Sequence, residues 1–527
     1  MKVLVAAPLD PAAIGILKAE ERLKVVVSNP LEFHTELADC EALIVRSSIN
    51  VTADVLAQAP QLKVIGRAGV GVDNIDCDAA TDRGIVVMNT PGGNATSVAE
   101  HTLALILSLA RSVPSASAST KAGRWEKKRF LGNEVFGKTL GIIGLGNIGR
   151  QVAQRAVPFG MEIVAYDPYV SSDAARDSGV ELIDLEPLLA RADYLSLHLS
   201  LTPETAGMIN ADTIAKMKDG VRIVNCARGE LIDSEALSEA IASGKVGGAA
   251  LDVYDKEPPA GSPLFTHEQV VATPHIGGAT AEAQAKVGID IAGQVRDFLN
   301  SGVVVNAVNT PSVSAEQFRR IAPYLQLAER LGSFVAQTST GRPVRVKITY
   351  FGNFGETDAV LIRNAALSGV LNCFLSERAN LVNAFQIARE RAIGVSEVRR
   401  GLEHFSDSIR LALKTEDIDR TVEGAVFPDG SPRVISVDGI YVEAYLVGSI
   451  LYVTNKDVPG VVGRLGTVLG ANGINISSFA LGRGERVSET EPAEAVALIQ
   501  TDEPLPASVL DRLYRMHAVV FAKAIDL

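Results

Sequence analysis

The 527-residue chain is poor in cysteine and has no long hydrophobic run. Its four cysteines, Cys40, Cys77, Cys226 and Cys373, show no CxxC spacing, which argues against a disulfide framework or a cysteine zinc site and favours a reducing, cytoplasmic compartment. The most apolar stretch, 103–110, is far shorter than a membrane span, and the first apolar run is stopped by Pro8. We therefore expect no membrane span, no signal peptide and no bound metal.

Positive charge is also in short supply. The chain has 50 Lys and Arg against 62 Asp and Glu, for a net charge of −12. This balance argues against nucleic acid or an anionic membrane as a general partner, and an anionic small molecule would need a local basic pocket. Hydrophobic residues make up 47% and charged residues 21%, which is typical of folded domains, and the length predicts three or four of them.

Strand-like and helix-like patterns alternate along most of the chain, which indicates α/β domains with parallel sheets. In the first segment we expect a helix over Pro11–Ala19 and strands at Val3–Ala6, Ala42–Arg46, Lys63–Arg67 and Ile85–Met88. A second doubly wound unit begins near Lys138. Residues 314–448 mix strands (Arg345–Tyr350, Arg433–Val437) with helices (Asp358–Leu375, Asn380–Arg391), and 449–527 follow the β-α-β-β-α-β order of a ferredoxin-like domain.

A glycine motif at the start of the second unit predicts a dinucleotide site. Gly144, Gly146 and Gly149 follow a strand and open a helix, where a pyrophosphate can approach the backbone and the helix N-terminus. Asp167 ends the next strand, where an acid hydrogen-bonds the ribose hydroxyls of NAD and disfavours the 2′-phosphate of NADP. The alternative is a tight turn that holds no ligand.

Three charged residues follow three successive strands of the same unit. Arg228 follows VRIVNCA, Glu257 follows GGAALDVYDK, and His275 follows VVATP. Because strand C-termini line the ligand crevice of a doubly wound sheet, all three can meet there. An imidazole can take a hydroxyl proton, a carboxylate can orient that imidazole, and a guanidinium can hold a substrate carboxylate. Taken singly, each residue also fits a structural role. Arg228 could form a surface ion pair, Glu257 could be a solvated loop acid, and His275 could cap a loop.

The motifs GLGNIG, NCARGELID, GGAALDVYDKEPP and TPHIGGAT together resemble the D-isomer-specific 2-hydroxyacid dehydrogenase family over about residues 40–310. The resemblance implies that Arg228, Glu257 and His275 are catalytic. It also implies a flavodoxin-like substrate domain, 1–97 plus 283–310, into which an NAD-binding Rossmann domain, 98–282, is inserted.

The resemblance also implies a set of cofactor contacts, and at Val70 and Leu199, where many relatives carry Thr, only the backbone would contribute. The implied NAD-binding residues are Val70, Gly144, Gly146, Asn147, Ile148, Gly149, Asp167, Leu199, Cys226, Ala227, Arg228, Asp252, His275, Gly277 and Gly278.

The substrate domain offers Arg46, Arg67 and Asn94 as substrate contacts, and the two arginines could hold a phosphorylated acid. The basic stretch 121–129 either adds cations from a neighbouring subunit or is a solvated loop. The implied reaction is NAD-dependent oxidation of 3-phospho-D-glycerate to 3-phosphohydroxypyruvate, which begins L-serine synthesis. The alternatives are a small unphosphorylated acid, such as glyoxylate, D-lactate or 2-hydroxyglutarate, or an NAD-sensing regulatory protein.

The whole chain resembles the long form of this family, with an intervening domain (314–448) and a C-terminal ACT domain (449–527). In that form L-serine binds at an ACT dimer interface, and by position Asn455, Asp457 and Asn475 would contact it. Asp457 also fits a helix N-cap and Asn475 a turn residue. The resemblance implies an allosteric homo-oligomer, expected to be a tetramer.

Overall fold

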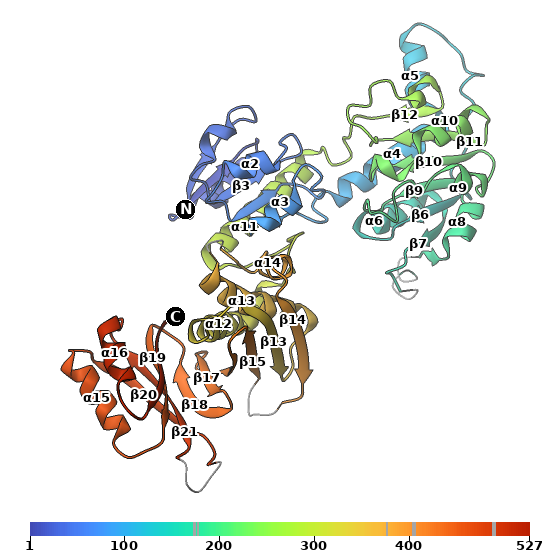
Figure 1. Cartoon of the computed structure of the whole chain (residues 1–527). Helices are drawn as coiled ribbons and strands as arrows, with labels where there is room; N and C mark the ends of the chain where they lie inside the picture. Colours follow the sequence, from blue (N-terminus) through green and yellow to red (C-terminus); the bar gives the residue numbers. More distant parts are fainter. Residues whose placement is uncertain (172–174, 176–178, 376–377, 403–406, 487–491) are drawn as a thin grey trace.

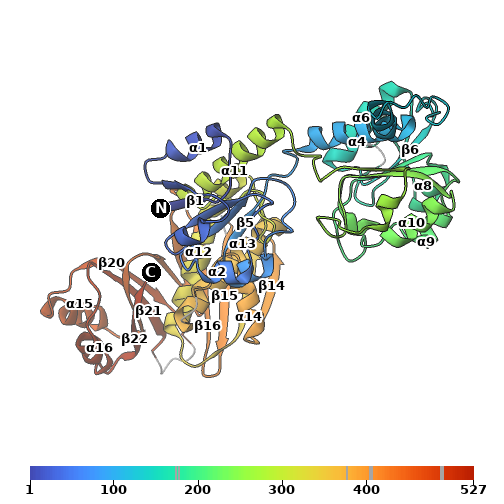
Figure 2. The same cartoon turned by 90° about the horizontal axis from the view of Figure 1, so that it is seen from above.

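The computed structural model describes residues 1–171, 175, 179–375, 378–402, 407–486 and 492–527. Four bodies follow one another through the described chain (Figure 1). Seen from above, the two N-terminal bodies stand side by side and the C-terminal body lies at the far end (Figure 2). The observed α/β class, with parallel sheets followed by two further sheet domains, confirms the predicted fold class.

The predicted substrate domain has a five-stranded parallel sheet in the flavodoxin-like order β2-β1-β3-β4-β5. Strand β2 was not predicted, and its residues are only partly buried at the sheet edge. The long helix α11 packs on α1 and returns the chain to this domain. The elements are β1 (Lys2–Val5), α1 (Pro11–Lys18), β2 (Lys24–Val27), η1 (Phe33–Glu36), β3 (Ala42–Val45), α2 (Ala53–Ala57), β4 (Val64–Arg67), α3 (Cys77–Asp82), β5 (Val86–Met88) and α11 (Ala281–Ser301).

The NAD domain has seven parallel strands in the order β12-β11-β10-β9-β6-β7-β8, a doubly wound sheet whose order reverses beside β6. The reversal places the ligand crevice at the C-terminal ends of β6 and β9. The elements are α4 (Ala95–Arg111), α5 (Val113–Lys121), β6 (Thr139–Ile143), α6 (Asn147–Ala156), η2 (Val157–Phe159), β7 (Glu162–Tyr166), β8 (Glu181–Leu182), α8 (Leu185–Arg191), β9 (Tyr194–Leu197), α9 (Ala211–Ala215), β10 (Val221–Asn225), η3 (Gly229–Leu231), α10 (Ser234–Ala242), β11 (Val246–Leu251), η4 (Pro263–Thr266) and β12 (Val270–Ala272).

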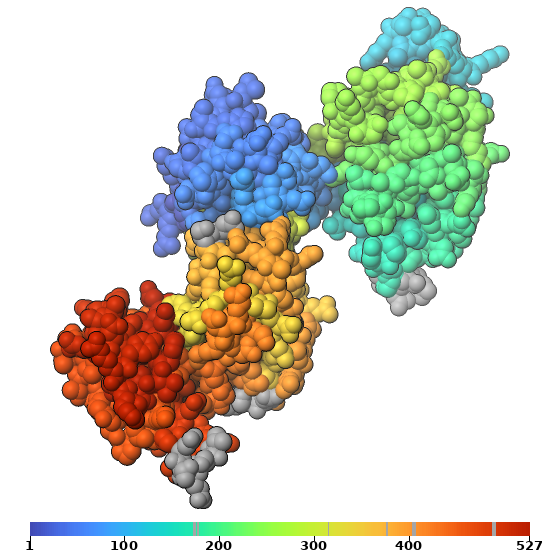
Figure 3. Space-filling model, in the orientation of Figure 1, coloured from blue at the N-terminus to red at the C-terminus, as the bar shows by residue number. Residues whose placement is uncertain are grey.

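Two chain crossings join these domains. The first leads into α4 and the second leads into α11, and the space-filling view shows the two bodies meeting along a narrow neck (Figure 3). The crossings are tied to each other, since the Ser97 and Thr280 hydroxyls lie 2.7 Å apart. A narrow, doubly crossed connection suits a hinge between substrate and cofactor domains.

The intervening domain is a six-stranded mixed sheet, β14-β13-β15-β16-β17-β18, covered by α12 and α13. The sequence patterns missed β14, β15, β16 and β18. Strand β14 is largely exposed and carries three charged residues, which hides its period, whereas β15 and β16 are mostly buried. The elements are α12 (Ala315–Thr338), β13 (Pro343–Phe351), α13 (Glu356–Phe374), α14 (Ala384–Glu390), β14 (Gly394–Arg400), β15 (Ser408–Thr415), β16 (Asp419–Val426), β17 (Pro432–Val437) and β18 (Ile440–Tyr445).

Helix α14 begins four residues later than the predicted start at Asn380. The Asn380 side chain accepts from the backbone N of Val382 and donates to the Gly84 carbonyl of the substrate domain, at 2.9 and 2.8 Å. A helical pattern alone assigns Asn380 to the first turn of α14, but in the structure this residue contacts the neighbouring domain instead.

The C-terminal sheet has the ferredoxin-like order β20-β21-β19-β22, and it matches the predicted element order. Its elements are β19 (Ser449–Lys456), α15 (Val461–Ala471), β20 (Ile476–Arg483), β21 (Glu494–Thr501), α16 (Ala507–Tyr514) and β22 (Val519–Asp526). The core of the intervening domain continues into this sheet through Ile450, Tyr452 and Val496. No helix among the described residues is long and apolar enough to cross a membrane.

Candidate active site

The glycine turn has the shape that a dinucleotide requires. Gly144 has a φ of +94°, and a side chain there would meet the His198 carbonyl. A Cβ on Gly149 would lie 2.1 Å from the Gly144 oxygen, so this glycine permits close packing of α6 on the turn. A Cβ on Gly146 would meet nothing within 4 Å, which leaves open space where a pyrophosphate would approach the helix N-terminus.

Asp167 lies at the end of β7, beside this turn. Its carboxylate accepts from the backbone N of Leu145 at 2.8 Å and of Tyr169 at 2.9 Å. The acid is therefore held against the glycine turn, at the place where an NAD ribose would lie. The turn, the open space at Gly146 and the acid together fit NAD.

His275 and Glu257 form a bonded pair at the C-terminal edge of the sheet. The His275 Nδ1 lies 2.7 Å from a Glu257 carboxylate oxygen, and both side chains are exposed, at 53% and 38%. The other Glu257 oxygen accepts from the Tyr254 backbone N at 3.2 Å. This leaves the Nε2 of His275 free of the pair, so that it can face a substrate hydroxyl.

Arg228 projects from the end of β10 toward the substrate domain. Its guanidinium lies 3.1 Å from the Asp73 carboxylate and donates to the Ala227 carbonyl at 2.7 Å. A Cβ on Gly229 would overlap the Tyr254 backbone, so the Arg228 segment packs directly on the segment that leads to Glu257. The three predicted catalytic side chains thus stand on adjoining loops at one edge of the sheet.

A cluster of cations lies on the substrate-domain side. Burial lowers the pKa of Arg67 to about 10, and the nearby positive charges of Arg228 and Arg46 contribute to this lowering against the opposing charge of Asp73. The Nε of Arg67 is buried without a hydrogen-bond partner. Arg46 contacts Gln284 of α11, at 3.5 Å. Three guanidinium groups therefore lie within electrostatic range of one another in an acidic protein.

Asp252 organises the loop that carries His275. It is buried (1% exposed), and it accepts from the Thr273 hydroxyl at 2.6 Å and from the backbone N of Ile276 and Gly277 at 2.9 and 2.8 Å. Burial alone would raise the pKa of Asp252, but these hydrogen bonds together with one from His101 outweigh it and lower the pKa. A carboxylate that stays ionised next to His275 suits the predicted contact with a nicotinamide carboxamide.

The remaining predicted cofactor and substrate residues lie near the glycine turn, before Arg228, or in the loops that lead toward α4. Leu199 packs beside Gly144, Asn147 begins α6 near Gly92, and Ile148 packs on the core below. Cys226 and Ala227 precede Arg228, and burial raises the pKa of the Cys226 thiol to about 12, so it is no nucleophile. In the loops that lead toward α4, the Val70 carbonyl accepts from Asn89, and Asn94 packs against Gly278.

The three predicted effector residues do not gather in one chain. Asn455 and Asp457 lie at the end of β19 that pairs with Glu494, whereas Asn475 precedes the end of β20 that pairs with Thr501. Seven residues of strand separate these ends, or roughly 20 Å. The Asn455 side-chain oxygen is buried without a partner, while Asn475 donates to Asp502 at 2.7 Å. A site with all three residues would need two copies of the chain.

The sequence patterns did not identify two polar residues of the site, Asp73 and His101. Asp73, in GRAGVGVDN, could be suspected only as an acid beside the predicted substrate arginine Arg67. His101 is a polar residue within the apolar helix α4, and its contact with Asp252 joins segments far apart in the chain, which no local pattern reveals.

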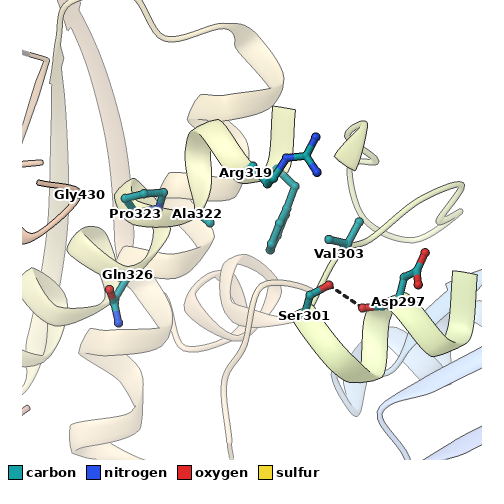
Figure 4. Close-up of a pocket in the computed structure, with 9 residues that line it drawn as sticks. Asp297, Ser301, Val303, Arg319, Ala322, Pro323, Gln326 and Gly430 are labelled. Atoms are coloured by element: carbon teal, nitrogen blue, oxygen red, sulfur yellow. Dashed lines mark hydrogen bonds between the residues drawn. The ribbon is translucent and has the colours of Figure 1, made fainter. Parts of the chain in front are cut away.

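One cavity lies away from this site. It has a volume of about 700 Å³ and opens between α11 and α12, where Ser301, Phe318, Arg319 and Pro323 line it (Figure 4). None of the predicted site residues borders it. Among the described residues, no group of three or more His, Cys, Asp or Glu side chains could hold a metal ion.

Known proteins resemble the chain over its whole length. Residues 103–277 match the NAD binding domain of the D-isomer specific 2-hydroxyacid dehydrogenases, and 320–438 match the D-3-phosphoglycerate dehydrogenase intervening domain. The D-3-phosphoglycerate dehydrogenase of Methanocaldococcus jannaschii is 43% identical over 97% of both chains. That of Bacillus subtilis is 38% identical over 100% of this chain and 99% of its own.

Solved structures match the N-terminal two domains. The TT0316 protein of Thermus thermophilus aligns with a TM-score of 0.54 and 36% identity over 58% of this chain and all of its own. The D-lactate dehydrogenase of Aquifex aeolicus, complexed with NAD and lactic acid, aligns with a TM-score of 0.52 and 31% identity over 59% of this chain and all of its own. The chain therefore belongs to the D-isomer specific 2-hydroxyacid dehydrogenase family of NAD-dependent oxidoreductases, and within it to the D-3-phosphoglycerate dehydrogenases.

Proposed function

We propose that this chain oxidises 3-phospho-D-glycerate to 3-phosphohydroxypyruvate with NAD, the step that opens L-serine synthesis. The full-length relatives named D-3-phosphoglycerate dehydrogenase support this function. The observation that carries it is the cluster of Arg46, Arg67 and Arg228, since the Arg228 segment packs on the segment that leads to Glu257. A substrate with both a carboxylate and a phosphate needs more cations than Arg228 alone.

The site residues have separate tasks in this reaction. Arg228 holds the substrate carboxylate after Asp73 gives up its ion pair, while Arg46 and Arg67 hold the phosphate. The Nε2 of His275 takes the C2 hydroxyl proton, and Glu257 at Nδ1 stabilises the imidazolium that forms. NAD, when bound, accepts the hydride from C2, so the alcohol loses a proton and a hydride and becomes the ketone.

We also propose a cytoplasmic homo-oligomer, expected to be a tetramer, that L-serine regulates. Trp125, Leu131 and Phe136 follow α5 and are 76%, 90% and 75% exposed, which suits a contact with a second copy. The effector site would form between two ACT domains, because Asn475 lies far from Asn455 and Asp457 in one chain.

Absorbance of NADH during turnover tests the reaction. The purified full-length chain should produce NADH from NAD and 3-phosphoglycerate, consume NADH with 3-phosphohydroxypyruvate, and act far more slowly on D-lactate. Equal rates on both acids would reassign the substrate. If neither direction turns over, a screen of other 2-keto acids separates a different dehydrogenase from an NAD-sensing protein.

A further inference from the structure

One face of the N-terminal part of α4 contacts the second chain crossing. Asn94 packs on Gly278, Ser97 lies 2.7 Å from Thr280, and His101 reaches Thr273. The spacing 94, 97, 101 is that of successive turns on one helix face. The helix that enters the NAD domain is thus joined, turn by turn, to the segment that carries His275.

His101 provides the deepest of these contacts. Its Nε2 lies 3.1 Å from the Thr273 hydroxyl oxygen and 3.3 Å from the Asp252 carboxylate, and the side chain is 18% exposed. The Thr273 hydroxyl donates to Asp252, so the hydroxyl oxygen is available to accept from His101. A proton on the His101 Nε2 can therefore be shared between the Thr273 hydroxyl oxygen and the Asp252 carboxylate.

Asp252 in turn holds the backbone of the catalytic loop. It accepts from the N–H groups of Ile276 and Gly277, which directly follow His275. His275 itself has a φ of +53°, a left-handed conformation that a residue with a side chain adopts only when its surroundings hold it there. Loss of the His101 contact would remove one of the donors to the buried carboxylate and weaken the support that Asp252 gives to this loop.

We propose that His101 is a positioning residue: through Thr273 and Asp252 it fixes the loop of His275 and the nicotinamide side of the cofactor site. The inference rests on the proposed NAD-dependent function. Because His101 stands on a helix that joins the two domains, it also links the domain arrangement to the geometry of the catalytic base.

The test compares His101→Leu with His101→Gln in the full-length chain. Leucine removes the donor, whereas the glutamine amide can place a nitrogen near the position of Nε2. We expect the leucine variant to bind NADH about tenfold more weakly and to lose about tenfold in kcat, and glutamine to restore most of both. Glu100→Gln, at an exposed neighbour on α4 that pairs with Arg155, is the matched control and should change neither.

NADH affinity is measured by fluorescence titration and folding by the thermal midpoint. A leucine variant with the parent's affinity and kcat would overturn the proposal. So would a glutamine variant as impaired as leucine, since packing and not the donor would then matter. The NADH titration needs no substrate, so a parent that binds NADH but does not oxidise 3-phosphoglycerate refutes the proposed function and leaves the His101 comparison intact.

Discussion

At the scale of single residues, the proposed site separates proton transfer from the recognition of substrate charge. His275 and Glu257 meet on one loop edge of the NAD domain, and Arg46 and Arg67 come from the substrate domain. Arg228 stands between them and is held by Asp73 of the substrate domain. Each of the arginines and Glu257 was identifiable from its place after a strand, but the Asp73 contact joins two domains and has no signature in sequence.

His275→Gln should lose at least about a hundredfold in kcat, because glutamine cannot take the hydroxyl proton. NADH affinity should stay within about twofold of the parent, since the Asp252 hydrogen bonds to Ile276 and Gly277 remain. Steady-state kinetics and NADH fluorescence check the two halves. A tenfold loss of NADH affinity would mean that His275 mainly shapes the cofactor site.

His198 predicts a pH dependence of stability. Burial lowers the pKa of His198 to about 4, and its Nδ1 has no partner. The unfolded imidazole takes a proton near pH 6.5 and the folded one only near pH 4, so stability is lost as the pH falls through this window. At pH 5, the His198→Gln variant should be spared about 2 kcal/mol of this loss in the free energy of unfolding.

Thermal midpoints at pH 7.5 and pH 5 measure the effect. Between pH 7.5 and pH 5, the thermal midpoint of the parent should fall about 5 °C further than that of the variant, for a domain of this size. Parallel losses in the two proteins would show that His198 does not contribute.

At the scale of elements, strand order and glycine positions determine where the site can form. Buried strands such as β1, β3 and β4 were predicted to within one residue, because an apolar run bounded by polar residues has few interpretations. The edge strands β2 and β14 were missed, because strands that are only partly buried at a sheet edge lack the continuous apolar run of a buried strand.

The glycine turn offers a matched pair of substitutions. Gly149→Ala forces a methyl group against the Gly144 oxygen and should cost about 1–3 kcal/mol, several degrees in the thermal midpoint, together with NADH affinity. Gly146→Ala places its methyl group in open space and should keep the midpoint while weakening NADH binding on the order of tenfold. An unchanged NADH affinity in Gly146→Ala would place the pyrophosphate elsewhere.

At the scale of the whole molecule, the intervening domain docks on the N-terminal domain and shares its core with the C-terminal ferredoxin-like domain. The α/β alternation and the ferredoxin-like tail could be predicted from periodic patterns, whereas the insertion of one domain in another was implied only by the family resemblance. The geometry between domains could not be predicted, since contacts such as Asn380 with Gly84 join residues 296 positions apart.

L-Serine should lower the rate of NADH formation by the full-length chain, and Asn475→Ala should raise the serine concentration needed at least about tenfold. The serine-free rate should stay unchanged, because the Asn475 side chain bonds Asp502 of its own domain, far from the active site. Inhibition that persists in the variant would place the effector elsewhere.

The central claim is that arginines of the substrate domain select a phosphorylated acid for the His275–Glu257 pair. The most direct test is kcat/KM of the parent and of Arg46→Ala, each measured with 3-phosphohydroxypyruvate and with an unphosphorylated 2-keto acid such as glyoxylate. Arg46→Ala should lower kcat/KM for the phosphorylated substrate on the order of a hundredfold. It should change kcat/KM for the unphosphorylated acid by less than about threefold. Equal losses on both substrates would contradict the account.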